Sequence, residues 1–89
     1  MHMENNEIVD ELDALNKKIM DILKVVNERV PKNVDVNLLD EGYIDSFDVV
    51  NIISDLEVAF DIEFEPEDII PENFQTIACI ASLIMQRMK

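Results

Sequence analysis

Residues 40–64, DEGYIDSFDVVNIISDLEVAFDIEF, contain a predicted amphipathic helix over residues 46–60. Each residue advances about 100° around a helix, so the spacing of the apolar residues assigns them to faces. The residues expected to be buried are Val49, Ile52, Ile53, Leu56 and Phe60. Phe47, Val50 and Val58 fall on the opposite face. A helix that only packed against a core would not require this second apolar set, so the pattern indicates a docking surface.

The rest of the chain is also predicted to be helical. Apolar residues at gaps of three and four predict a long first helix that ends before Pro31. Turn-forming residues then predict a long loop up to the second helix. Pro66 begins a short helix that Pro71 ends, and Thr76 or Asn73 caps the last helix. We therefore expect an all-α fold, a four-helix bundle with three main helices and one short helix.

Composition limits the possible partners. The 89-residue chain carries a formal net charge of -13, which argues against binding to nucleic acid or anionic membranes and favours basic partners. Cys79 is the single cysteine, so an internal disulfide is impossible and a reducing compartment is expected. With no predicted signal or membrane-inserted segment, we expect a cytoplasmic monomer. Residues 1–3 resemble an expression scar, and residues 4–89 are expected to form one domain.

Ser46 is the candidate functional residue, and its neighbours allow two interpretations. The lone histidine, His2, falls in the predicted scar, so Ser46 lacks a base for nucleophilic catalysis. A calcium loop centred on Gly42 fails because Leu39 occupies a position that needs an oxygen ligand. A serine at a helix N-terminus can accept a phosphate ester, with the Asp45 carboxylate beside it. Alternatively, Ser46 or Asp45 merely caps the helix.

The stretch around Ser46 resembles the attachment region of the acyl carrier protein family. The shared residues are Gly42, Asp45-Ser46, Phe47, Asp48, Leu56-Glu57, Phe60-Asp61, Ile62 and Pro66-Glu67-Asp68. Residues 73–84, NFQTIACIASLI, resemble the last helix of the family. The resemblance implies a four-helix bundle whose Ser46 carries 4'-phosphopantetheine, transferred from coenzyme A by a phosphopantetheinyl transferase. The thiol of this arm would hold acyl or aminoacyl groups as thioesters, and the protein itself would catalyse nothing.

The resemblance further implies that the second helix is a recognition surface. Its candidate partner-binding residues are Phe47, Asp48, Val50, Asn51, Ser54, Asp55, Glu57 and Asp61. The expected partners are the transferase, an acyl- or aminoacyl-loading ligase, and a synthase, transferase or thioesterase with a basic docking surface. Ser54 and Asn51 depart from the fatty-acid carrier pattern, and DEGYIDSF is more similar to discrete carriers of the D-alanyl, polyketide and peptide types. The alternative hypothesis is a non-catalytic acidic adaptor that lacks the arm.

Overall fold

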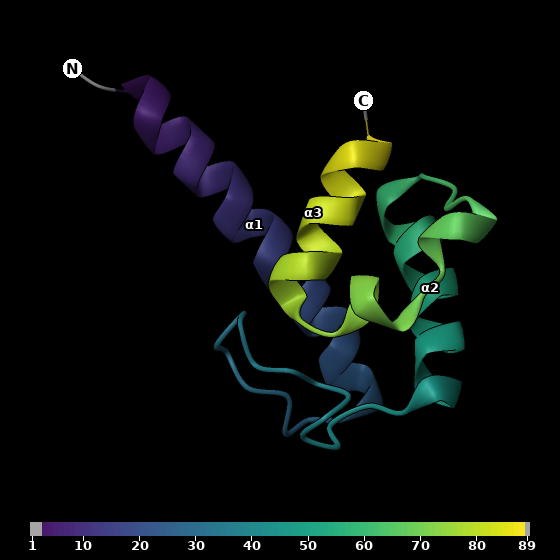
Figure 1. Cartoon of the computed structure of the whole chain (residues 1–89). Helices are drawn as coiled ribbons and strands as arrows, with labels where there is room; N and C mark the ends of the chain where they lie inside the picture. The colour runs from purple at the N-terminus through teal and green to yellow at the C-terminus, as the bar shows by residue number, and fades with distance from the viewer. Residues whose placement is uncertain (1–2, 89) are drawn as a thin grey trace.

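The described part of the chain folds into three α-helices and two short 3-10 helices. The computed structural model describes residues 3–88, with side chains described from residue 11 onward. The elements in chain order are α1 (Met3–Val26), α2 (Ser46–Phe60), η1 (Pro66–Asp68), η2 (Pro71–Phe74) and α3 (Ile77–Arg87). No strand occurs within residues 3–88, so the predicted all-α fold is confirmed. Figure 1 shows α1 running antiparallel to α2 and α3, and α1 packs against both of them.

The predicted short fourth helix is present as η1, a 3-10 helix, and a second 3-10 helix, η2, follows it. Pro66 begins η1 as expected, but Pro71 begins η2 instead of closing the segment. Proline has no N–H to donate and its ring clashes with the preceding turn, so one continuous helix cannot pass through Pro71. The segment containing η1 and η2 runs back along the bundle between the end of α2 and the start of α3 (Figure 1). It therefore occupies the position expected for the short helix.

Helix α1 ends earlier than the position of Pro31 indicates. Its last residue is Val26, and the Asn27 side chain accepts a hydrogen bond from the Arg29 backbone N–H at 2.9 Å. Asparagine side chains compete in this way with helical hydrogen bonding, so the chain turns before the proline is reached. Val30 is nevertheless buried, as its position in the apolar stripe predicts. Met1 and His2, in the predicted expression scar, lie outside the described residues.

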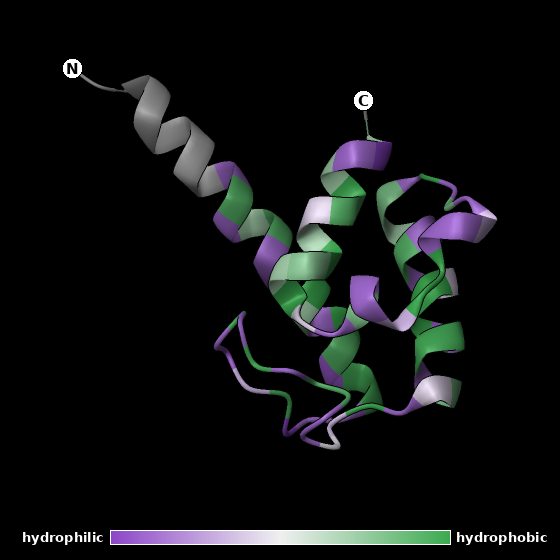
Figure 2. Ribbon diagram, in the orientation of Figure 1, coloured by the Kyte–Doolittle hydropathy of each residue, from purple (hydrophilic) through white to green (hydrophobic). Residues whose placement is uncertain are grey.

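The core lies between the three helices and is entirely apolar at its centre. Figure 2 shows hydrophobic residues along the inner faces of α2 and α3 and along the described part of α1. Phe64 and Phe74 meet edge to face, with ring centroids 5.9 Å apart. The largest fully buried side chains are Ile19, Leu23, Val30, Leu38, Ile52, Leu56, Phe74, Ile77, Ile80 and Ile84. The predicted inward face of α2 is confirmed, with Val49 and Phe60 half-buried at its edges.

Backbone hydrogen bonds join the loop between α1 and α2 to the start of α3. The Leu38 N–H donates to the Gln75 carbonyl at 2.6 Å, and the Ala78 N–H donates to the Val34 carbonyl at 3.0 Å. Leu38 is fully buried, so the middle of the loop is part of the core. Although the loop is long, its backbone is therefore joined to the rest of the fold at Val34 and Leu38.

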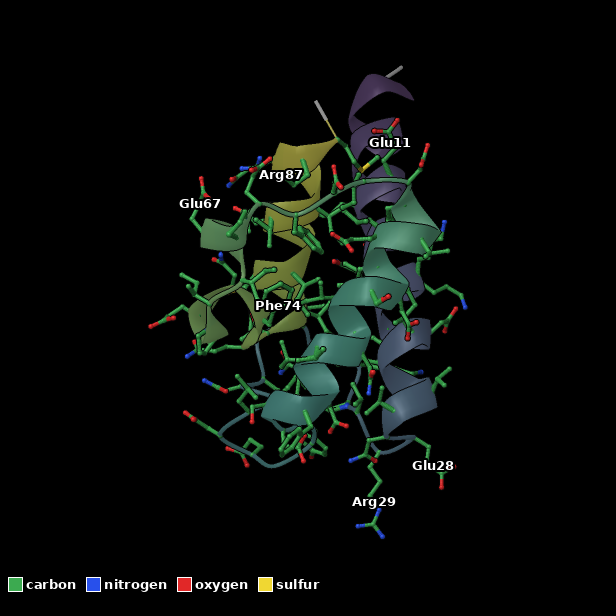
Figure 3. All side chains as sticks on the ribbon, turned by 90° about the vertical axis from the view of Figure 1, so that its right-hand side faces the viewer. Glu11, Glu28, Arg29, Glu67, Phe74 and Arg87 are labelled. Atoms are coloured by element: carbon green, nitrogen blue, oxygen red, sulfur yellow. The ribbon has the colours of Figure 1, made fainter. Side chains whose placement is uncertain are left out.

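One buried carboxylate anchors the η1 segment to α3. Asp68 accepts a hydrogen bond from the Glu65 N–H at 2.8 Å, and the Nε atom of Arg87 lies 3.1 Å from its Oδ2 atom. The latter contact is an ion pair outside hydrogen-bond geometry. Figure 3 shows Arg87 on α3 at the same end of the molecule as Glu67 of η1. A buried carboxylate needs such partners to offset its lost hydration, so Asp68 stabilises the segment that contains η1 and η2.

Candidate functional site

Ser46 is exposed at the first position of α2, and a different residue caps the helix. The Oδ1 atom of Asp45 accepts the Asp48 N–H at 2.9 Å. In return the Oδ2 atom of Asp48 accepts the Asp45 N–H at 3.0 Å, which completes a capping box. The sequence left open whether Ser46 or Asp45 caps the helix, and the structure shows that Asp45 does. The Ser46 hydroxyl is not needed for the cap, and Ser46 is an exposed residue.

The loop that leads to Ser46 turns at the single glycine. Gly42 has φ +80°, a left-handed conformation that a residue with a Cβ atom rarely adopts. After this turn the Tyr43 and Ile44 N–H groups both donate to the Leu38 carbonyl, at 2.9 and 3.2 Å. Ile44 is buried in the core, whereas Asp45 and Ser46 are exposed. The polypeptide thus passes from the interior to the surface one residue before the helix cap.

An apolar stripe begins beside Ser46 and follows the outer face of α2. Phe47 and Val58 are each 82% exposed, and Val50 is 65% exposed. These residues recur at helical spacing, so they share one face. Figure 3 views the molecule from the side on which α2 lies. The sequence prediction that these three apolar residues point outward is confirmed, and Val58 extends the surface beyond the residues first named as partner-binding.

The acidic residues around this stripe fall into two groups. Asp55 and Asp61 are exposed, as are the polar residues Asn51 and Ser54. Asp48 and Glu57 are half-buried and already bound within the chain. The Asp48 carboxylate serves the capping box described above, and the Oε2 atom of Glu57 accepts the Phe64 N–H at 2.9 Å. Pattern alone could not distinguish these groups, because both occupy acidic positions on the same helix.

The α2 helix ends in a left-handed residue that is not glycine. Asp61 has φ 54°, and its N–H donates to the Glu57 carbonyl. Aspartate adopts this conformation more readily than most residues because its short polar side chain can bond locally. Asp61 therefore has a structural role as C-cap as well as an exposed carboxylate at the far end of the stripe.

Within the described side chains, no three His, Cys, Asp or Glu residues are arranged to hold a metal ion. None of the described helices is long and apolar enough to cross a bilayer. A cavity of about 610 Å³ lies at the other end of α2, where Phe60 faces Leu15 and Met85, and Ser46 does not line it. The start of α2 thus presents two exposed polar residues, Asp45 and Ser46.

Comparison with known proteins matches this arrangement to a family. Residues 13–84, well over half of the chain, match the family described as the phosphopantetheine attachment site. The chain belongs to the acyl carrier protein family. It is similar to the D-alanyl carrier protein of Lactococcus lactis subsp. lactis (strain IL1403), with 29% identity over 75 residues that cover 82% of this chain and 95% of the relative.

A second acyl carrier relative is more similar over a shorter stretch. The D-alanyl carrier protein of Bacillus cereus (strain B4264) is 39% identical over 54 residues, which cover 58% of this chain and 68% of that protein. Membership of the family makes the chain a carrier protein with a covalently attached 4'-phosphopantetheine arm. Carrier proteins as a class are non-catalytic and interact with transferases and ligases. An exposed serine hydroxyl at a helix N-terminus fits this group, because free N–H groups and the helix dipole favour a phosphate there.

Proposed function

We propose that Ser46 carries the 4'-phosphopantetheine arm and that the protein is a stand-alone carrier of thioester-linked acyl or aminoacyl groups. The observation that carries the proposal is the exposed Ser46 hydroxyl at a helix start capped by Asp45. Because the cap is made by the neighbouring residue, an ester on Ser46 would leave the helix N-terminus intact. The bound arm supplies a terminal thiol that forms thioesters with the cargo.

The loading step requires a partner enzyme. The Ser46 oxygen forms a bond to the phosphorus of the pantetheine phosphate, and coenzyme A loses the remainder as adenosine 3',5'-bisphosphate. The serine proton passes to a base on the phosphopantetheinyl transferase. Asp45 uses Oδ1 for the helix cap, so its Oδ2 atom is available to a metal ion held by the transferase. We assign Asp45 this second role, in addition to capping.

The outer face of α2 is the proposed docking surface for this transferase and for later partners. We define the α2 docking stripe as Phe47, Val50, Asn51, Ser54, Asp55, Val58 and Asp61, which are all exposed. The apolar members supply area that can be buried, and the acids attract lysine and arginine on the partner. Asp48 and Glu57, also predicted as partner-binding, would contribute their charge while remaining bound within the chain.

The names of the relatives favour one class of cargo. Both named relatives are D-alanyl carrier proteins. We therefore favour an aminoacyl cargo, activated by an adenylate-forming loading ligase and then passed to an acceptor-specific transferase. The carrier itself would hold the cargo without reacting with it. The adaptor alternative, which lacks the arm, is not favoured because the chain matches the attachment-site family.

Intact-protein mass spectrometry tests the attachment residue. The unmodified chain, incubated with a broad phosphopantetheinyl transferase and coenzyme A, should gain the mass of one phosphopantetheine. Ser46→Ala should gain nothing, whereas Ser82→Ala, a matched change at an exposed serine on α3 and outside the α2 docking stripe, should load fully. Loading of Ser46→Ala would show that the arm is attached at another residue.

A further inference from the structure

We propose that Asn27 is a positioning residue for the loading of Ser46. The inference rests on the proposed function, because it concerns the same hydroxyl. Asn27 directly follows the last residue of α1 and is half-buried. Ser46 begins the next helix, so the two residues belong to different elements that only the fold brings together.

The Asn27 side chain forms one hydrogen bond with each end of its amide. Its Nδ2 atom donates to the Tyr43 carbonyl at 3.0 Å, across a part-buried contact. Its Oδ1 atom accepts the Arg29 N–H at 2.9 Å. The first contact needs a donor and the second needs an acceptor, so only one orientation of the amide satisfies both. Asn27 is therefore held rigidly at the end of α1.

The Tyr43–Ile44 peptide is consequently fixed on both sides. Asn27 holds its carbonyl, and its N–H, which belongs to Ile44, donates to the Leu38 carbonyl at 3.2 Å. The Ile44 side chain is only 3% exposed, which fixes the next Cα atom as well. Rotation of this peptide would break a hydrogen bond at each end and disturb a core side chain.

Only Asp45 separates this fixed segment from the reacting serine. The Asp45 N–H donates to the Asp48 carboxylate at 3.0 Å, and its carbonyl accepts the Val49 N–H at 3.1 Å. The backbone is thus held at each residue from Tyr43 to Asp45. Asn27 is the member of this series that connects it to α1, and it provides the only side-chain donor to the segment among the described residues.

Orientation of this kind affects chemistry more than binding. A nucleophile reacts efficiently only from near-attack geometry, and a displacement of about 1 Å can cost about 100-fold in rate. The α2 docking stripe follows Ser46 in the chain, and the hydrogen bonds of Asn27 go to Leu23, Arg29, Val30 and Tyr43, which are outside the stripe. Losing the Asn27 contact should therefore lower kcat for loading and leave KM for the carrier nearly unchanged.

The test uses Asn27→Asp in the full chain, with a phosphopantetheinyl transferase and coenzyme A. Aspartate keeps the acceptor for the Arg29 N–H but replaces the donor to the Tyr43 carbonyl with an oxygen. We expect kcat to fall by about tenfold, with KM within about twofold of the unmodified sequence. Asn27→Ser, which is too short to reach Tyr43 and adds no charge, should behave in the same way. It decides the question if the aspartate variant does not fold.

Asn73→Asp is the matched control. The Nδ2 atom of Asn73 donates to the Asp68 carbonyl at 2.8 Å, so this change removes the same kind of bond and adds the same charge away from Ser46. This variant should be loaded at the same rate as the chain without substitutions. Unchanged kcat in the Asn27 variants, or an equal loss in Asn73→Asp, would overturn the inference. If the unmodified chain loads at a residue other than Ser46, the proposed function itself is wrong.

Discussion

Asp45 and Asp48 each bind the other's backbone N–H group at the start of α2, at 2.9 and 3.0 Å. This reciprocal contact satisfies two of the donors that a helix N-terminus leaves free. It also assigns helix capping and the exposed hydroxyl to two different residues. Asp45 caps the start of the helix, and Ser46 next to it is exposed and free to carry the proposed phosphate ester.

Substitutions at Asp45 should separate helix capping from loading. Asn is as good a helix cap as Asp, so the free energy of unfolding of Asp45→Asn should lie within about 0.5 kcal/mol of that of the original sequence. If the carboxylate also contacts a metal ion in the transferase, the same variant should load more slowly. Asp45→Ala should lose about 1 kcal/mol because the cap is removed. Urea unfolding and loading kinetics on the three proteins measure both effects, and normal loading of Asp45→Asn would exclude the metal contact.

Truncation to alanine should lower stability on the inner face of α2 and partner turnover on its outer face. Leu56 is fully buried, so Leu56→Ala should cost about 2–5 kcal/mol of stability by leaving a cavity. Phe47 is 82% exposed, so Phe47→Ala should change stability by less than about 0.5 kcal/mol while weakening partner turnover. Chemical denaturation and the transferase KM provide the readouts. A larger stability loss in Phe47→Ala than in Leu56→Ala would contradict the assignment of the faces.

The Asp68–Arg87 ion pair should stabilise the protein more than a surface pair does. Asp68 is buried and Arg87 is about one-third exposed, so Asp68→Asn should cost about 1–2 kcal/mol, below the range for fully buried pairs. The control is Asp21→Asn, which breaks the exposed Lys17–Asp21 pair with its 3.8 Å separation. That change should cost at most about 0.5 kcal/mol. Equal losses in the two variants would mean that burial does not strengthen the Asp68 contact.

Gly42 should be required for its backbone conformation and not for space. An added Cβ atom would meet nothing within 4 Å, yet the φ angle of +80° is strained for residues other than glycine. Gly42→Ala should therefore cost about 1–2 kcal/mol, and Gly42→Asn less, because asparagine tolerates left-handed backbone. Urea unfolding of both variants tests this order. An alanine variant at least as stable as the asparagine variant would contradict it.

Binding of the transferase to the α2 docking stripe should weaken with added salt. Exposed charges are screened beyond about 10 Å at 0.1 M ionic strength and beyond about 3 Å at 1 M. The transferase KM for this chain, which has a net charge of -13, should rise with salt while kcat changes little. In Asp55→Asn the rise should be shallower, because one exposed charge of the stripe is gone. A KM that does not depend on salt would argue for a purely apolar contact.

The parts of the fold predicted correctly are those encoded locally. The periodicity of residues 46–60 identified both faces of α2, because each side chain's direction follows from helical geometry alone. Thr76 caps α3 as expected, with its hydroxyl accepting the Cys79 N–H at 2.9 Å. The family pattern around Ser46 is likewise contained in one continuous stretch of sequence.

The features that were missed depend on contacts between distant residues. Asn27 ends α1 early and reaches Tyr43, but nothing in its local sequence names that partner. The burial of Asp68 depends on Arg87, which lies at the end of another helix. The half-buried state of Glu57 similarly depends on the Phe64 N–H, which the chain presents only after it has turned at the end of α2. From the sequence alone such residues look like ordinary polar surface residues, because the sequence around them does not name their tertiary partners.

The hydrogen bonds from Leu38 to Gln75 and from Ala78 to Val34 have a consequence for biosynthesis. During synthesis Ser46 emerges from the ribosome before Gln75 and Ala78. A nascent chain therefore exposes the serine while the loop before it still lacks both hydrogen bonds to these residues. A transferase that requires the folded loop would pass over such chains. Cofactor attachment would then mark polypeptides whose α3 has emerged and docked, and chains interrupted before α3 would not receive the arm.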